Sequence, residues 1–81
     1  MMPVKLFRIG EVMNYSGLSR QTVHNYTILG LIREVDRSQG GHRLYGEDVF
    51  ERIRLIEDLK KSKTLKEIRR IFDTPEGTKD V

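Results

Sequence analysis

Apolar side chains in the first part of the chain recur with the spacing of a helix. Within residues 7–16, Ile9, Val12 and Met13 occupy positions i, i+3 and i+4, which places them on one face of a short helix. Gly17 follows, and a glycine in this place is typical of a helix C-terminus. The pattern therefore predicts a first helix that ends before Gly17.

A second short helix is predicted over residues 20–29. The side chain of Ser19 can cap its first turn, and Gly30 suits the position just beyond its last turn. Val23 and Tyr26 form a narrow apolar stripe that would face the interior. Because only residues 17–19 separate the two helices, the pair has the spacing of a helix-turn-helix.

The outward face of this second helix is polar but carries little charge. By the helical period it presents Arg20, Gln21, His24, Asn25 and Ile28. A solvent-exposed face usually carries Glu and Lys, whereas these polar types are rich in hydrogen-bond donors that can reach base edges and phosphates. The face favours reading of a nucleic-acid groove, with plain solvation as the alternative.

The helical period disappears between residues 31 and 45. Two short, partly alternating runs, residues 31–35 and 42–45, flank the polar segment 36–41. This arrangement predicts a small β-hairpin whose turn contains Gly40 and Gly41. Two glycines alone do not make a phosphate-binding loop, which would need a Gly-Lys-Ser/Thr sequence after them.

The longest helix is predicted to begin at Glu47 and Asp48. Its apolar stripe consists of Val49, Ile53, Ile56 and Leu59, widened by Phe50 and Leu55. The charged residues are expected on the opposite face in a structural role: Glu51, Arg52, Arg54, Glu57, Asp58 and Lys60.

A fourth helix is predicted after a break at residues 61–63. Thr64 and Glu67 match a capping box that would start this helix. Its inward residues are expected to be Leu65, Ile68, Ile71 and Phe72. Pro75 and Gly77 should stop it, and the last residues show no periodicity.

Length and composition fit one folded domain. The chain has 81 residues, of which 37% are hydrophobic and 33% charged, so it has enough apolar residues to build a core. No window approaches the roughly 18 apolar residues of a membrane span, and the N-terminus lacks the apolar region of a signal peptide. We therefore expect a cytoplasmic protein that has no membrane partner.

The residues available for chemistry argue against an enzyme. There is no cysteine, which excludes disulfides, thiol nucleophiles and zinc sites with Cys ligands. The two histidines, His24 and His42, fall on different predicted elements, and the carboxylates occupy helix starts and ion-pair positions. We expect no metal site, no cofactor and no catalysis.

The basic residues are unevenly distributed. The formal net charge is only +3, but residues 61–70 contain five Lys and Arg residues against Glu67 alone. Such a run suits a polyanion and equally a solvated helix face. The tyrosines, Tyr15, Tyr26 and Tyr45, are expected to be core residues with the hydroxyl at the surface rather than bases for stacking.

Five short motifs occur in order along the chain: Ile9-Gly10-Glu11-Val12; Gly17-Leu18-Ser19 with Thr22-Val23; Tyr26 with Gly30-Leu31-Ile32; Gly41-His42-Arg43-Leu44-Tyr45; and Glu47-Asp48. Over residues 7–72, their order and gaps resemble the N-terminal DNA-binding domain of the mercury-resistance-regulator (MerR) family. The resemblance implies a bacterial transcription regulator that binds specific sites on double-stranded DNA.

The fold expected from the pattern and the resemblance is a winged helix-turn-helix. It is mainly α, with four helices and a small β-hairpin wing between the second and third helices. We expect the domain to cover residues 1–74 and a flexible C-terminal tail to cover residues 75–81.

The resemblance also implies roles for individual residues. The outward residues of the second helix would face the major groove, Tyr26 would support that helix or contact a phosphate, and Arg43 would clamp the backbone from the wing. The break between Lys60 and Thr64 would form a second wing. The expected DNA contacts are Arg20, Gln21, His24, Asn25, Tyr26, Arg37, Arg43, Lys61 and Lys63.

Two departures from the family pattern lie at the expected interface. The chain has His24-Asn25-Tyr26-Thr27 where family members commonly have Arg-Tyr-Tyr-Glu, and His42 where an aromatic residue usually precedes the wing arginine. The chemistry that faces the groove therefore differs, and the usual operator of the family does not carry over.

The partners implied are double-stranded DNA, a second copy of the protein in a full-length form, and RNA polymerase. Dimers of the family depend on a long helix after this domain, and residues 73–81 lack the repeated apolar positions of a coiled coil. We therefore expect the 81-residue chain to be a monomer, either as part of a longer regulator or as a minimal relative. The alternatives are an excisionase-like protein that bends DNA and a protein-interaction module.

Overall fold

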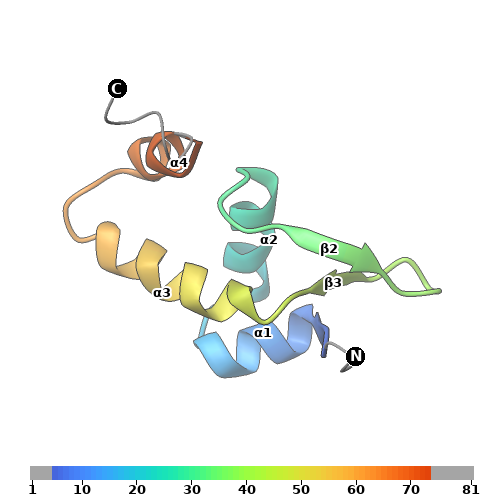
Figure 1. Cartoon of the computed structure of the whole chain (residues 1–81). Coiled ribbons are helices and arrows are strands. Elements are labelled where there is room, and N and C mark those ends of the chain that lie inside the picture. The colour runs from blue at the N-terminus through green and yellow to red at the C-terminus, as the bar shows by residue number, and fades with distance from the viewer. Residues whose placement is uncertain (1–4, 74–81) are drawn as a thin grey trace.

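The computed structural model describes residues 5–73, which form four helices and one small antiparallel sheet (Figure 1). The elements are β1 (Phe7–Arg8), α1 (Ile9–Ser16), α2 (Arg20–Ile28), β2 (Glu34–Arg37), β3 (Arg43–Tyr45), α3 (Asp48–Leu59) and α4 (Leu65–Asp73). The mainly helical architecture with a wing between the second and third helices is confirmed. The tail expected over residues 75–81 lies outside the described residues.

The first element is a strand, and the expectation of a helix from residue 7 is wrong. Phe7 and Arg8 pair with Tyr45 and Leu44 of β3. Arg8 is extended, with φ −84° and ψ 164°, and its backbone N–H donates to Oε1 of Glu11 at 2.9 Å. This bond lowers the pKa of Glu11 and fixes the start of α1 at Ile9. The periodicity of the sequence could not show the strand, because its partner is far away along the chain.

Both ends of α2 have the caps that the sequence predicts. Ser19 Oγ accepts a hydrogen bond from the backbone N–H of Thr22 at 3.1 Å. After the last turn, Gly30 adopts φ +80°, its N–H donates to the carbonyl of Thr27 at 3.1 Å, and the N–H of Leu31 donates to that of Tyr26 at 2.8 Å. This pair of bonds is the Schellman arrangement, which ends the helix and turns Leu31 into the core.

The wing is part of a three-stranded sheet of order β1-β3-β2. β2 lies later than the predicted run 31–35, because Leu31 and Ile32 are buried in the turn after α2. Asp36, expected in the hairpin turn, pairs with β3, and the register shifts between Glu34 and Asp36. The turn glycine is confirmed by the φ of +86° at Gly41.

The core lies where the helices and the sheet meet. Its buried residues are Val12, Val23, Tyr26, Leu31, Ile32, Tyr45, Val49, Ile53, Ile56 and Ile68. Three residues expected inside are exposed instead: Tyr15 by 73%, Leu55 by 47% and Ile71 by 45%. These corrections share a reason, since a short helix packs against its neighbours along a narrow stripe and apolar residues at the edge of that stripe stay in water.

Arg52 of α3 contacts the turn after α2 and the helix α4, which fits the structural role expected for the charges of this helix. Arg52 Nε donates to the carbonyl of Leu31 at 2.9 Å, and its guanidinium lies 4.0 Å from the centre of the Phe72 ring on α4. The predicted capping box of α4 is confirmed: Thr64 N–H donates to Glu67 Oε1 at 2.8 Å, and Glu67 N–H donates to Thr64 Oγ1 at 3.1 Å.

Candidate nucleic-acid interface

A groove of about 460 Å³ lies between α2 and the hairpin. It is lined by Ile9, Arg20, Gln21, His24, Arg37, Gly41, His42 and Arg43. Three of these residues are arginines, two are histidines and none is acidic. The groove therefore offers many hydrogen-bond donors and positive charge in one concave surface, which suits a polyanion.

The polar face of α2 forms one wall of this groove. Arg20 and Gln21 are exposed, and Gln21 Nε2 donates to Oδ1 of Asn25 at 3.0 Å. Asn25 is exposed on the same helix but does not line the groove itself. The outward orientation expected for these residues and for Ile28 is confirmed.

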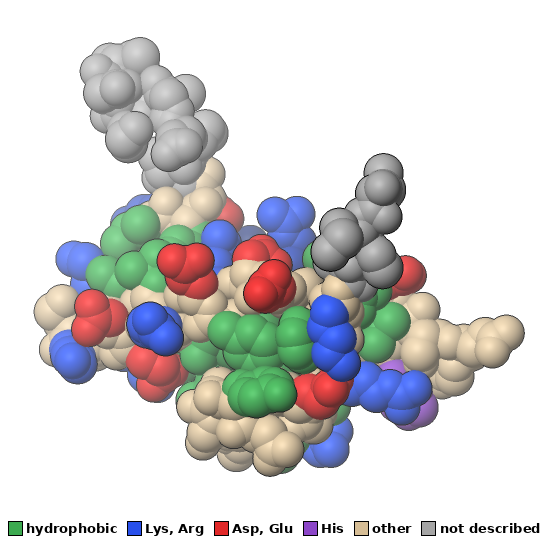
Figure 2. Space-filling model, turned by 60° about the horizontal axis from the view of Figure 1, so that its bottom comes forward, with side chains coloured by type: hydrophobic (Ala, Val, Ile, Leu, Met, Phe, Trp, Pro, Cys, Tyr) green, Lys and Arg blue, Asp and Glu red, His purple; other side chains and the backbone are tan. Residues whose placement is uncertain are grey.

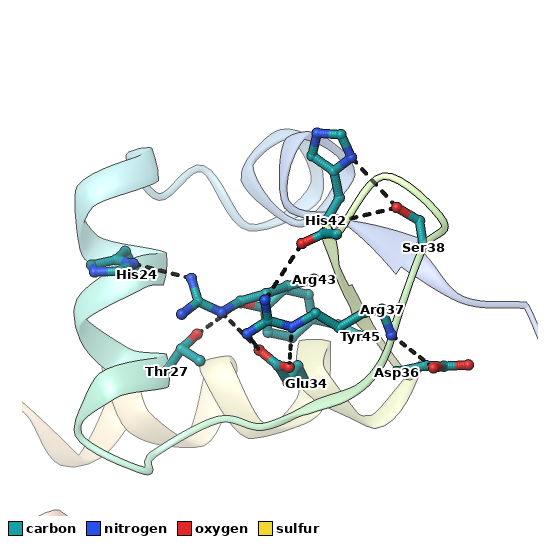
Figure 3. Close-up of polar contacts among 10 residues, drawn as sticks. His24, Thr27, Glu34, Asp36, Arg37, Ser38, His42, Arg43 and Tyr45 are labelled. Carbon is teal, nitrogen blue, oxygen red and sulfur yellow. Dashed lines mark hydrogen bonds and ion pairs between the residues drawn. The ribbon is translucent and has the colours of Figure 1, made fainter.

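The opposite wall is organised around Glu34, which binds two arginines (Figure 3). Arg37 donates through Nε to Oε2 at 2.7 Å and through Nη2 to Oε1 at 3.2 Å. Arg43 donates through Nε to Oε1 at 2.7 Å. The hydrogen bond from Arg37, and then that from Arg43, holds the pKa of Glu34 below its ordinary range. Two arginines and one carboxylate leave this wall positive.

Side chains from the wing also contact α2 directly. Nη1 of Arg43 lies 3.2 Å from Nδ1 of His24, and the hydroxyl groups of Thr27 and Tyr45 lie 2.8 Å apart (Figure 3). The guanidinium group of Arg43 is thus held by two partners, Glu34 on the sheet and His24 on α2. These contacts fix the position of the wing relative to α2.

Tyr26 lies in the core and does not line the groove. Its side chain is 1% exposed, and its hydroxyl donates to Glu57 Oε2 at 2.6 Å and accepts from Lys60 Nζ at 3.0 Å. Burial, followed by the hydrogen bond to Glu57, raises the pKa of Tyr26. Of the two roles implied for this residue, its position suits support of α2.

Lys61 and Lys63 lie away from the groove, in the turn between α3 and α4. Both are exposed, and Lys61 Nζ lies 3.4 Å from Asp58 Oδ1. Figure 1 shows this turn and the hairpin at opposite ends of the molecule, with α2 between them. The basic residues therefore flank α2 on two sides.

Two polar residues of this region did not emerge from the sequence as site residues. Glu34 looks like any acidic residue of a strand, and its bonds join it to arginines three and nine residues further along the chain. His42 lines the groove, and its backbone N–H donates to Ser38 Oγ at 3.1 Å. A possible signal was its place directly before the wing arginine, where it departs from the family pattern.

Within residues 5–73 the structure contains no cluster of three acidic or histidine side chains that could hold a metal ion. Over the same residues, no helix has the length and apolar character needed to cross a membrane.

The fold and the basic groove define a winged helix-turn-helix domain. Residues 7–74 match the model of the MerR HTH family of regulatory proteins. Since the match covers most of the chain, the chain belongs to this family.

The chain is also similar in sequence to known regulatory and nodulation proteins. The chain is 37% identical over 68 residues to the nodulation protein NolA of Bradyrhizobium sp. (strain NC92), covering 83% of the chain and 29% of NolA. It is 35% identical over 67 residues to the mercuric resistance operon regulatory protein of Bacillus cereus, covering 82% of the chain and 51% of that protein. The chain thus spans between about a third and half of these relatives.

A solved structure with the same fold is that of HiNmlR, a MerR family regulator lacking the sensor domain, bound to promoter DNA. The similarity has a TM-score of 0.73 at 25% identity and covers 83% of this chain and 54% of HiNmlR.

Proposed function

We propose that this chain is the DNA-binding domain of a bacterial transcription regulator and binds specific sites on double-stranded DNA. α2 enters the major groove, and the hairpin lies over the phosphate backbone. The observation that carries this proposal is the groove in which three arginines and two histidines stand beside the exposed polar face of α2. The DNA-bound state of HiNmlR supports it.

The residues divide into two groups by what they contact. Arg20, Gln21, His24 and Asn25 read base edges, because they project from the outward face of α2. Arg37, Arg43, Lys61 and Lys63 contact phosphates, since they lie on both sides of that helix. Tyr26 positions α2 through its bonds to Glu57 and Lys60 on α3 and its end.

The first test is the salt dependence of binding to duplex DNA. Each neutralised phosphate adds about −0.9 to the slope of log affinity against log salt, so roughly three to five contacts give a slope of about −3 to −5. A slope near zero would refute the proposal.

Variants then separate base reading from phosphate binding. On a site selected from random sequence, Arg20→Ala or Asn25→Ala should cost about 1–3 kcal/mol if that residue contacts a base, with little loss on random DNA. Lys63→Ala should weaken binding to all sequences alike. Arg54→Ala, which removes an exposed arginine of α3 outside the groove, serves as the control. If neither α2 variant changes site preference, α2 is not the reading helix.

The proposal also covers the location, oligomeric state and partners of the protein. The protein acts in the cytoplasm and has no enzymatic activity. The 81-residue chain is a monomer in dilute solution. A longer form is a homodimer and works with RNA polymerase. A monomer binds a half-site weakly, because it lacks the gain in effective concentration, often 10² or more, of a linked second domain. Light scattering over a concentration series tests this, and a stable dimer at low micromolar concentration would contradict it.

A further inference from the structure

His24 is the groove-lining residue whose hydrogen-bonding state the surrounding structure fixes. Its Nδ1 lies 3.2 Å from Nη1 of Arg43, and Nε of the same arginine donates to Glu34 at 2.7 Å. Arg43 is only 27% exposed, so packing and two partners hold its guanidinium in place. The chain of contacts runs from the sheet through Arg43 to α2.

The chemistry of the two groups decides which ring nitrogen carries the proton. A guanidinium has N–H donors and no acceptor, so Nδ1 of His24 must accept the hydrogen bond. A neutral imidazole has one donor and one acceptor, which leaves the proton on Nε2. His24 therefore presents an N–H donor from the other edge of its ring, on a helix wall that lines the groove.

A single donor in the major groove distinguishes between base pairs. Guanine presents two adjacent acceptors there, N7 and O6, whereas adenine presents N7 beside the N6 amino group, which is itself a donor. A donor placed between the two positions is satisfied by both acceptors of guanine and opposed by the amino group of adenine, whereas thymine offers O4 alone, without a second acceptor beside it.

We infer that His24 is a specificity-determining residue that selects a guanine through its Nε2–H, with Arg43 as the positioning residue that fixes its tautomer. The inference rests on the proposed function, because it requires α2 to lie in the major groove. In this inference Arg43 has a second role besides phosphate contact, and Glu34 holds the guanidinium group of Arg43 in position.

The test in DNA replaces guanines one at a time by 7-deazaguanine, which lacks the N7 acceptor, in a site selected with the unmodified protein. At one guanine of the half-site, the replacement should weaken binding about tenfold. His24→Ala should weaken binding to the unmodified site by a similar factor and abolish sensitivity to that one replacement, as a double-mutant cycle requires. His42→Ala, which removes the other histidine of the groove, should keep the sensitivity in full.

The test in the free protein is the ¹⁵N NMR spectrum of the His24 ring at neutral pH. We expect a protonated Nε2 and an unprotonated Nδ1, and we expect Arg43→Met to give a mixture of both tautomers and weaker discrimination of guanine from adenine at the same position. A proton on Nδ1 in the unmodified protein would overturn the inference.

The possible failures are distinguishable. If the protein binds a selected site with steep salt dependence but no guanine shows His24-dependent sensitivity, the inference is wrong and the proposed function stands. If binding shows neither salt dependence nor site preference, the proposed function is wrong and the inference falls with it.

Discussion

Glu34 places a carboxylate between the guanidinium groups of Arg37 and Arg43, which are the groups expected to face DNA phosphates in the proposed complex. The three hydrogen bonds at 2.7 to 3.2 Å show that both arginines can converge on one anion. A phosphate approaching the wing is repelled by this carboxylate and competes with it for the donors of Arg37. We therefore expect the glutamate to hold the two arginines in the free protein and to oppose indiscriminate binding to DNA.

Replacing this carboxylate by its amide tests the competition. Glu34→Gln should bind random duplex several-fold more tightly at low salt, with the gain fading as salt screens the charges. Glu51→Gln, which makes the same change of net charge at an exposed position in the first turn of α3, is the control. Equal gains in the two variants would show that only net charge matters. Titration by fluorescence anisotropy measures both.

The hydroxyl of Tyr26 should contribute to stability. Tyr26→Phe removes its bonds to Glu57 and Lys60, although those two side chains keep an ion pair of 3.6 Å. We expect the free energy of unfolding to fall by about 1–2 kcal/mol, since a buried polar contact is lost without a large change of shape. Urea denaturation measures this. Tyr15→Phe, at a largely exposed ring, should change stability little, and equal losses in both variants would contradict the assigned role.

At the scale of elements, helix ends could be predicted from the sequence far better than strands. Ser19, Gly30 and the pair Thr64 and Glu67 act on backbone groups within a few residues, so their identity alone carries the signal. β1 forms only through pairing with β3, and the register shift in β2 depends on the sheet as a whole. Neither leaves a local pattern that could be found beforehand.

Gly30 is the position at which the end of α2 should tolerate substitution least. Its φ of +80° disfavours any side chain, and a methyl group there would lie 3.5 Å from Nε of Arg69 on α4. We expect Gly30→Ala to lower the free energy of unfolding by about 1–2 kcal/mol. Gly10→Ala, in α1 with no atom within 4 Å of the added methyl, should instead be neutral or stabilising. Thermal and urea denaturation compare the two, and equal effects would contradict this reading of Gly30.

The capping box of α4 should make stability depend on pH. The backbone N–H of Thr64 lowers the pKa of Glu67 from its ordinary value of 4.5. A lowered pKa in the folded state means that the carboxylate stabilises the fold above the ordinary glutamate range and loses this effect as the pH falls through the folded pKa. The melting temperature of the unmodified protein should exceed that of Glu67→Gln at neutral pH, and the difference should shrink below about pH 4. A difference that does not change with pH would refute the role of the charge.

At the scale of the whole molecule, charge is unevenly distributed over the surface. Figure 2 shows a band of hydrophobic side chains with charges of both signs around it. The rings of Phe7, Tyr15 and Phe50 pack edge to face. The groove beside α2, by contrast, has basic lining residues and no acidic one. The net charge of +3 could not predict this distribution, because a net charge does not say where on the surface the charged residues lie.

The candidate site could be predicted in part. The outward residues of α2 follow from the helical period, and Arg43 follows from the family resemblance. The link from Glu34 through Arg43 to His24 could not be predicted, because it joins β2, β3 and α2 across the groove. Such a link depends on side-chain directions in three elements that only the folded chain brings together.

The order of strands in the sheet has a consequence for local unfolding. β3 is the middle strand, with β1 on one side and β2 on the other, so β1 and the hairpin belong to one sheet through their shared strand. Detachment of β1 would leave the hairpin as two strands, which are marginal in water on their own. In native-state hydrogen exchange, the amides of β1 and of the hairpin should therefore exchange with similar protection, as one cooperative unit. We therefore expect the flexibility of the wing to depend partly on Phe7 and Arg8, which lie far from it along the chain.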